Sequence, residues 1–150
     1  ADCLNEGAWE VLGSDISTRV LERARLGHYA RERATHIPPD YLKRFCLRGF
    51  GPQEGTLLVV RQVRRRVQFT QLNLNAPLPR IGLFDVIFLR NVMIYFNETT
   101  KRQVAARVLG QLKPRGYCFV GHSESLHGLV DSVQQVAPSI YRLHTEASNQ

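Results

Sequence analysis

Residues 84–96, FDVIFLRNVMIYF, decide the fold that this sequence predicts. The first six form a hydrophobic run typical of a buried strand, and Arg90 and Asn91 follow it directly. The chain then returns to apolar residues and ends the stretch with the aromatic pair Tyr95 and Phe96. A charged side chain at the end of a core strand costs desolvation energy unless it has a partner. We therefore expect Arg90 to face a cleft or a buried acid.

Strand and helix patterns alternate on both sides of this stretch. A strand pattern over residues 9–14 precedes a helix pattern over 17–25. After residue 96, a helix pattern over 101–112 precedes a second buried-type strand over 117–121. Such alternation indicates an α/β fold with a mostly parallel sheet and helices on both of its faces.

The stretch between these two α/β parts has a different character, because glycine and proline break its pattern. Strand patterns follow over 56–61 and 67–72. The connection between these two strand patterns is too short for a parallel crossover but long enough for an antiparallel pair. We therefore expect the two strands to pair with each other in a small insertion over residues 45–70. A further antiparallel pair is expected over 133–143, on either side of Pro138.

In an open α/β sheet, ligands bind beyond the carboxyl ends of the strands. Four polar groups follow predicted strands in this way: Asp15, Asn73, Arg90 with Asn91, and residues 122–124. A carboxylate at Asp15 can accept hydrogen bonds from both hydroxyls of a ribose, or it can cap the helix that follows. Asn73 can pair with an adenine edge while Leu74 packs on the ring, although asparagine is equally common in turns.

Arg90 and Tyr95 can each be interpreted in two ways. Arg90 could hold a carboxylate through two charge-assisted hydrogen bonds, and Tyr95 could offer a hydroxyl or a ring wall. A salt bridge and a core tyrosine are the alternatives. Residues 122–124, His-Ser-Glu, lack the G-x-S-x-G turn and the third member of a catalytic triad. The histidines and three cysteines show no metal-ligand spacing, so we expect no metal and reduced thiols, with Cys118 in a strand core.

The charge balance favours an acidic partner. Twenty Lys and Arg against 13 Asp and Glu give a formal net charge of +7, with Arg61 and residues 64–66 in one short run. Nucleic acid is the weaker hypothesis, because neither an aromatic-rich sheet nor a recognition helix is evident. The N-terminus has no signal-peptide character, and no apolar run reaches the roughly 18–20 residues of a membrane helix. We expect a cytoplasmic protein that is not inserted in a membrane.

Taken together, these stretches resemble the CheR family, the S-adenosylmethionine-dependent chemotaxis-receptor glutamate methyltransferases. The similarity covers roughly residues 8–144 and is most specific at 90–96 and 121–124. Other matching stretches are residues 13–17, 40–45, 51–55, 73–74 and 112–116. The resemblance implies a Rossmann-like methyltransferase sheet with a small antiparallel β-subdomain, which corresponds to the insertion at 45–70.

The resemblance also implies the cofactor and its contacts. S-adenosylmethionine would bind, and S-adenosylhomocysteine would be the product. The implied contacts are Asp15 at the ribose, Asn73 and Leu74 at the adenine, and Arg90 and Asn91 beside the methionine part. Tyr95 would lie near the transferred methyl group, so Arg90 and Tyr95 are the implied catalytic residues.

The implied activity is methyl transfer to glutamate carboxylates on the cytoplasmic helices of chemotaxis receptors. The alternative is a non-catalytic fragment that tethers to a receptor's C-terminal peptide through the β-subdomain. Family members begin with a helical domain and a first sheet strand, and residues 1–7 resemble the end of the helix after that strand. We therefore expect residues 1–150 to be a partial methyltransferase domain, truncated at its N-terminus, which could self-associate through unpaired strands.

Overall fold

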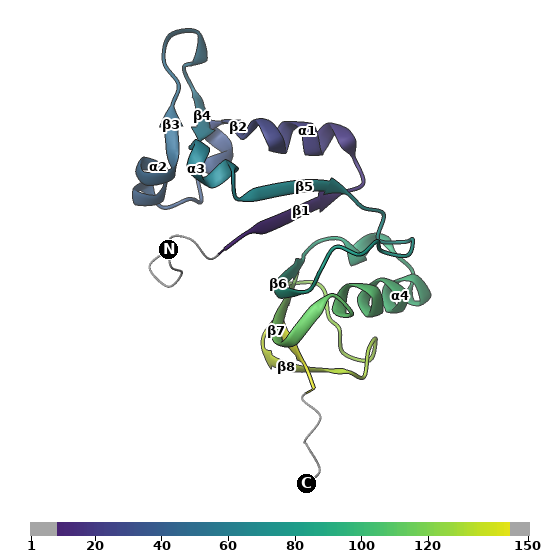
Figure 1. Cartoon of the computed structure of the whole chain (residues 1–150). Helices are drawn as coiled ribbons and strands as arrows, with labels where there is room; N and C mark the ends of the chain where they lie inside the picture. Colours follow the sequence, from purple (N-terminus) through teal and green to yellow (C-terminus); the bar gives the residue numbers. More distant parts are fainter. Residues whose placement is uncertain (1–8, 145–150) are drawn as a thin grey trace. The chain divides into compact units, whose positions relative to one another are not determined.

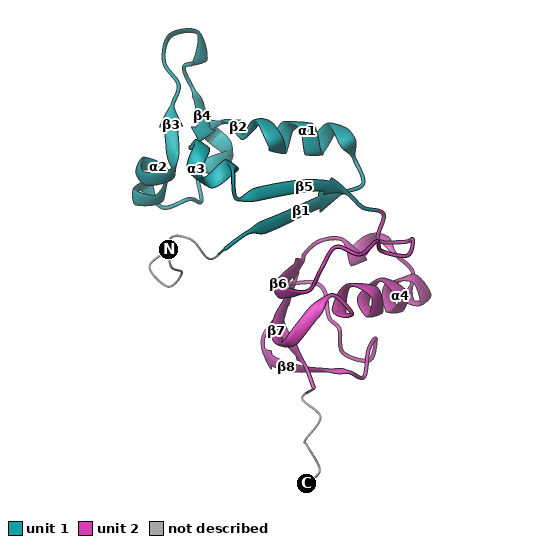
Figure 2. Ribbon diagram, viewed as in Figure 1, with its two compact units in different colours: residues 1–72 teal, residues 73–150 magenta. Residues whose placement is uncertain are grey.

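The computed structural model describes residues 9–144. The predictions for residues 1–7, and the thiol of Cys3, lie outside the described residues. The chain divides into two compact units, residues 1–72 and residues 73–150 (Figure 2).

The first unit contains a parallel strand pair and an antiparallel sheet (Figure 1). Its elements, in chain order, are β1 (Val11–Asp15), α1 (Thr18–Leu26), β2 (His28–Ala30), η1 (Arg31–Ala34), α2 (Pro39–Phe45), β3 (Cys46–Arg48), η2 (Gly51–Gln53), β4 (Thr56–Val59), α3 (Arg61–Arg64) and β5 (Val67–Gln71). β1 and β5 pair in parallel, with Val11 opposite Val67. The other three strands form an antiparallel sheet in the order β2-β4-β3.

The antiparallel sheet differs from the prediction. β4 pairs with β2 and β3, while β5 pairs with β1, so the predicted pairing of residues 56–61 with 67–72 is wrong. The physical reason is α3, which turns the chain between these strands. Arg64 holds that turn, because its Nε donates to the carbonyl oxygen of Val59 at 3.0 Å. The antiparallel sheet lies within residues 28–59, and we propose this range for the insertion in place of 45–70.

The helix predicted over residues 17–25 is confirmed as α1. Ser17 is its N-cap, because the Ser17 hydroxyl accepts a hydrogen bond from the N–H of Val20 at 3.4 Å. Gly27 ends the helix at a φ of 63°, in the left-handed region that glycine reaches without steric cost. Arg25 ties the helix to β5 by donating to the carbonyl oxygen of Phe69 at 3.0 Å. This helix therefore fixes the chain just beyond the carboxyl end of β1.

The second unit is a mixed four-stranded sheet with one α-helix among its described residues. Its elements are β6 (Phe84–Leu89), η3 (Met93–Tyr95), α4 (Glu98–Leu109), β7 (Leu112–Val120), β8 (Val133–Ala137) and β9 (Ile140–Leu143). The sheet order is β6-β7-β9-β8, parallel between β6 and β7 and antiparallel elsewhere. The strands predicted over 84–89 and 117–121 and the final antiparallel pair are confirmed. Within residues 9–144, no helix combines the length and apolar character needed to cross a membrane.

The core of the second unit lies on one face of this sheet, under α4. Its buried members are Leu89, Met93, Val104, Ala105, Val108, Leu109, Leu112, Cys118, Val120, Leu126 and Tyr141. On the other face Val86 and Phe88 are 44% and 69% exposed, although the ring of Phe88 stacks on that of Phe119 with centroids 5.0 Å apart. β6 is thus buried on one face, and the helices expected on both faces are not found among the described residues of this unit.

Cys118 lies in β7 with no exposed surface, as the sequence predicts. Burial raises the pKa of its thiol to about 11, so the thiol stays protonated at neutral pH. Cys46 in β3 is a half-buried free thiol. Neither Cys46 nor Cys118 forms a disulfide with a residue over 9–144.

Candidate functional site

Asp15 ends β1 and forms a local turn with the start of α1. Its Oδ1 accepts a hydrogen bond from the N–H of Ser17 at 2.8 Å. The N-cap of α1 is Ser17 and not Asp15. The alternative in which Asp15 caps this helix is therefore right only in that Asp15 binds the N–H of the capping residue. The other carboxylate oxygen of Asp15 accepts no hydrogen bond from residues 9–144, which leaves it able to accept one from a ligand.

Asn73 and Leu74 follow β5 in the chain and begin the second unit. The Oδ1 of Asn73 accepts from the N–H of Asn75 at 3.0 Å. Asn73 therefore stabilises a turn, as asparagine commonly does. Its amide NH₂ group remains a donor. Leu74 packs against the core of the unit, and its carbonyl oxygen accepts from Arg107 of α4 at 3.1 Å. The turn is therefore held in place at Leu74.

Arg90 and Asn91 follow β6, and both side chains are exposed. Asn91 has a φ of 59°, a left-handed conformation that asparagine tolerates better than most residues. Tyr95, in η3, is 80% exposed, so the alternative of a core tyrosine is wrong. Within the described part of the chain, Arg90 forms no ion pair, so the alternative of a salt bridge is not found either.

A buried acid does lie beside this turn, but it binds the backbone and not Arg90. Glu124 is 9% exposed, and its carboxylate accepts four backbone N–H groups. Oε1 accepts from Val92 at 2.9 Å and from Met93 at 2.8 Å. Oε2 accepts from Asn91 at 2.7 Å and from Gly121 at 2.8 Å. We call this carboxylate and its four donors the Glu124 cradle.

Two opposing effects set the pKa of Glu124. Burial raises the pKa of the carboxyl group, because it penalises the charged form. The four backbone hydrogen bonds lower the pKa, and together they outweigh burial, so the pKa of Glu124 lies below its ordinary value. The cradle therefore holds a carboxylate, and not a carboxylic acid, at neutral pH.

This lowered pKa predicts a pH dependence of stability. The carboxylate stabilises the fold at pH values above the pKa of an unfolded glutamate, about 4.3, and the contribution is lost as the pH falls through the lower folded pKa. Wild type should exceed Glu124→Gln in free energy of unfolding at pH 7, and this difference should narrow as the pH falls below about 4. Urea unfolding at pH 7 and at successively lower pH values measures the difference. A difference that does not narrow below about pH 4 would contradict the prediction.

Gly121 makes the cradle possible. A Cβ atom at this position would lie 2.5 Å from Oε2 of Glu124 and 3.2 Å from the backbone nitrogen of Asn91. The sequence interpretation placed residues 122–124 among the groups after a strand but assigned Glu124 no role. The available signal was a glutamate three residues after a glycine that ends a buried strand. Its four partners could not be found that way, because three of them lie more than thirty residues away.

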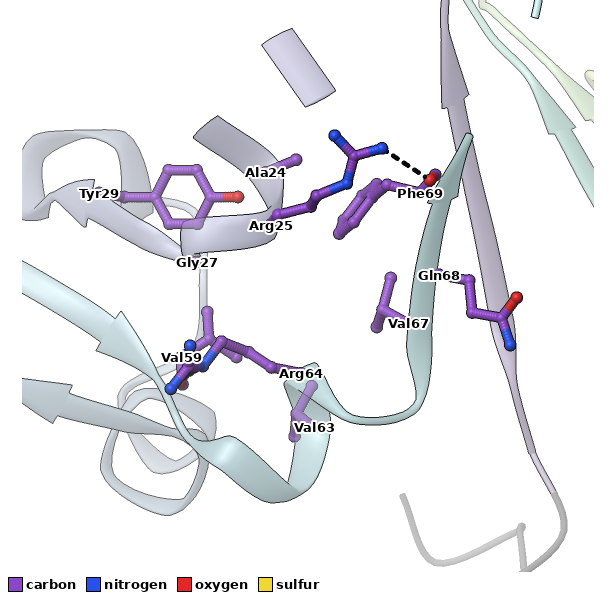
Figure 3. Close-up of a pocket in the computed structure, with 10 residues that line it drawn as sticks. All are labelled: Ala24, Arg25, Gly27, Tyr29, Val59, Val63, Arg64, Val67, Gln68 and Phe69. Carbon is purple, nitrogen blue, oxygen red and sulfur yellow. Dashed lines mark hydrogen bonds between the residues drawn. The ribbon is translucent and has the colours of Figure 1, made fainter. Parts of the chain in front are cut away.

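A cavity of about 490 Å³ lies beneath α1 in the first unit (Figure 3). Val59, Val63 and Phe69 contribute to its apolar wall. Its two arginines, Arg25 and Arg64, already donate to backbone carbonyl oxygens. None of the residues predicted to bind the cofactor lines this cavity. It is therefore not the candidate cofactor site.

The structure and the comparisons together define the class of protein. Parallel strand pairs, helices and an inserted antiparallel sheet confirm the α/β fold class. Residues 2–141 match the family model described as "CheR methyltransferase, SAM binding domain", and the chain belongs to this family. The resemblance seen in the sequence is thus confirmed, and S-adenosylmethionine (SAM) is the cofactor of the family.

The chain is also similar to curated relatives. It is 42% identical over 138 residues to the chemotaxis protein methyltransferase of Escherichia coli, covering 91% of this chain and 48% of that protein. The chemotaxis protein methyltransferase 2 of Pseudomonas aeruginosa is 41% identical over 133 residues, covering 88% of this chain and 48% of that protein. The chain spans about half the length of the curated relatives it matches.

A solved structure, the glycopeptide N-methyltransferase MtfA complexed with S-adenosyl-L-homocysteine, matches at 19% identity with a TM-score of 0.47. That match covers 91% of this chain and 45% of the MtfA chain. So low a score carries no inference about this chain.

Proposed function

We propose that the protein transfers methyl groups from SAM to glutamate side chains of chemotaxis receptors, forming methyl esters. The observation that carries this proposal is the match of residues 2–141 to the CheR SAM-binding domain. Two relatives that share about two fifths of their aligned residues with this chain are named chemotaxis protein methyltransferases. The polar residues Asp15, Asn73, Arg90 and Asn91 follow the carboxyl ends of β1, β5 and β6, and ligands of α/β proteins bind beyond such ends.

The chemistry of these residues fits the cofactor. The carboxylate oxygen of Asp15 that binds no described residue suits the ribose hydroxyls. The NH₂ group of Asn73 suits an acceptor on the adenine ring, and Leu74 offers apolar contact. Arg90 and Asn91 present exposed donors for the methionine part, which carries a carboxylate. We propose these five residues as the cofactor contacts.

The proposed reaction requires little acid–base catalysis by the side chains of this protein. SAM, when bound, supplies an electrophilic methyl group. A glutamate acceptor is already ionised at neutral pH, so no general base is required. The chain must bind and orient the reactants, and orientation alone can supply a large part of the rate enhancement. We assign that role to Arg90 and Tyr95, whose exposed side chains follow β6. Arg90 must not hold the acceptor carboxylate too tightly, since that would weaken it as a nucleophile.

Calorimetric titration of this chain with S-adenosylhomocysteine tests the cofactor part of the proposal. We expect one binding site with a Kd in the micromolar range. A chain that is folded by circular dichroism and yet releases no heat would contradict cofactor binding. Transfer of a labelled methyl group to a receptor cytoplasmic fragment tests the acceptor. The label should be released at alkaline pH, as a carboxylate ester is, and a label stable to base would contradict glutamate as acceptor.

We also propose a second function, the tethering of a receptor peptide, which is favoured by the edge of β3 that pairs with no strand over residues 9–144. The carbonyl oxygen of Phe45 accepts from Val60 and the N–H of Gly49 donates to Thr56, both at 2.9 Å. Alternate residues of an antiparallel strand bond to the same neighbour, so the backbone groups of Cys46 and Arg48 point away from β4. The N–H of Cys46 already donates to the carbonyl oxygen of Leu42 at the end of α2, so the groups that remain for a peptide are those of Arg48 and the carbonyl oxygen of Cys46. An extended receptor C-terminal peptide can add to such an edge as a further strand.

The tethering proposal predicts that two substitutions at Arg48 differ strongly in their effect on affinity for a receptor C-terminal peptide. Arg48→Pro removes the outward N–H and leaves the bonds to β4 intact, because proline is tolerated on a free strand edge. Arg48→Ala keeps that N–H and is the matched control for the lost side chain. We expect the proline variant to bind a labelled receptor C-terminal peptide about tenfold more weakly than the alanine variant. Fluorescence anisotropy measures this, and equal affinities would contradict binding along β3.

A further inference from the structure

We propose that Glu124 is a positioning residue for the cofactor, setting the backbone of the turn from which Arg90 and Asn91 reach the methionine part. This inference rests on the proposed function and adds to it a residue that touches neither cofactor nor acceptor. Three features of the second unit carry it: the connection that the cradle makes, the conformation that it holds, and the atoms that it uses.

The Glu124 cradle joins two loops that follow adjacent parallel strands. Leu89 ends β6 and lies opposite Val120, which ends β7. Three of the four donors follow β6, Asn91 and Val92 in the loop and Met93 at the start of η3, and the fourth is Gly121 after β7. One carboxylate therefore fixes the spacing of two loops at the edge of the sheet where α/β proteins bind their ligands.

The cradle also holds a turn that contains a residue in the left-handed backbone conformation. Asn91 has a φ of 59°, and its N–H donates to Oε2 of Glu124 at 2.7 Å. Two residues later Met93 is 2% exposed, so its side chain anchors the far end of the turn in the core. Arg90 and Asn91 keep exposed side chains. The backbone is thus fixed from the inside while these two side chains face outward.

The cradle is, in chemical terms, an anion site that the chain fills with its own carboxylate. Converging backbone N–H groups bind anions well, and here all four converge on Glu124. Since the bonds go to main-chain atoms, no side-chain donor of Arg90 or Asn91 is used. These donors remain available for the cofactor. A structural carboxylate at this place therefore prepares the turn without competing for its side chains.

Glu124→Gln tests the inference, with Glu98→Gln as the control for an exposed carboxylate of α4. The amide has nearly the shape of the carboxylate, but its NH₂ group faces two N–H donors and cannot accept from them. We expect Glu124→Gln to raise the Kd for S-adenosylhomocysteine at least tenfold. Its Kd for adenosine, which lacks the methionine part, should change less than about twofold. Both titrations are made well below the unfolding midpoint of each variant.

The outcomes separate this inference from the proposed function. A folded Glu124→Gln that binds both ligands like wild type would show a purely structural residue and overturn the positioning role. Equal losses for both ligands would overturn it too. Wild type that binds no S-adenosylhomocysteine would overturn cofactor binding itself and the inference with it.

If Glu124→Gln does not fold, amide hydrogen exchange on wild type replaces it. S-adenosylhomocysteine should slow exchange at Asn91, Val92, Met93 and Gly121 more than at Val104 and Val108 of α4. Equal slowing at both sets would overturn the inference.

Discussion

Replacing Arg90 by alanine is expected to raise the Kd of the chain for S-adenosylhomocysteine about 10- to 100-fold. Arg90 is an exposed guanidinium directly after β6, with no ion pair to any residue over 9–144. A charge-assisted hydrogen bond to a ligand carboxylate contributes about 1.5–3 kcal/mol, and each 1.4 kcal/mol is a factor of about ten in Kd. Calorimetric titration of the wild-type and variant chains measures the change.

The control for this prediction is Arg102→Ala. Arg102 is an exposed arginine of α4, so the variant loses the same charge from the same unit. A general effect of net charge on an anionic ligand would weaken both variants alike. An unchanged Kd in Arg90→Ala would remove this residue from the proposed site.

Gly121→Ala is the second change with a large expected effect, and it acts on stability. The new Cβ atom would meet Oε2 of Glu124 at 2.5 Å, so the carboxylate must move and give up N–H donors. Overpacking and unpaired buried donors each cost about 1–3 kcal/mol, and we expect a loss of about 2–4 kcal/mol in the free energy of unfolding. Urea unfolding followed by circular dichroism measures this loss.

Gly110→Ala is the matched control, because Gly110 follows α4 with a φ of −63° that any residue adopts. A Cβ atom there lies 3.4 Å from the carbonyl oxygens of Ala106 and Arg107, close to ordinary contact. We expect its free energy of unfolding to stay within about 1 kcal/mol of wild type. Equal losses in both variants would show that the cradle tolerates a methyl group at position 121.

Much of the second unit can be predicted from sequence, because its signals are local. The hydrophobic run of β6 and the periodic apolar residues of α4 each lie within a dozen residues. The helix predicted over 101–112 is α4, but it spans Glu98–Leu109, because Asn97 caps it through an Oδ1 that accepts from the N–H of Thr100 at 2.9 Å. The candidate site residues could also be predicted, because each of them follows a predicted strand. That signal does not depend on knowing which strands pair.

The rest could not be predicted, because it depends on distant pairing. β2 and β3 have three residues each, too few for an alternating pattern to show. The predicted partner of residues 56–61 was therefore the nearest strand pattern in the sequence. Glu124 was missed for a related reason. Nothing in the residues 122–124 shows that a carboxylate there accepts N–H groups from a loop more than thirty residues away.

The inserted antiparallel sheet has a consequence for how the first unit folds. The parallel ladder of β1 and β5 places Val11 opposite Val67, so more than fifty residues must be closed into a loop before the ladder can form. The entropy of that closure grows only slowly with length, but folding rates fall as the contacting residues become more distant in sequence. α1 and the β3–β4 hairpin need only short-range contacts and can form early. Closure of β1 on β5 would then set the folding rate of this unit.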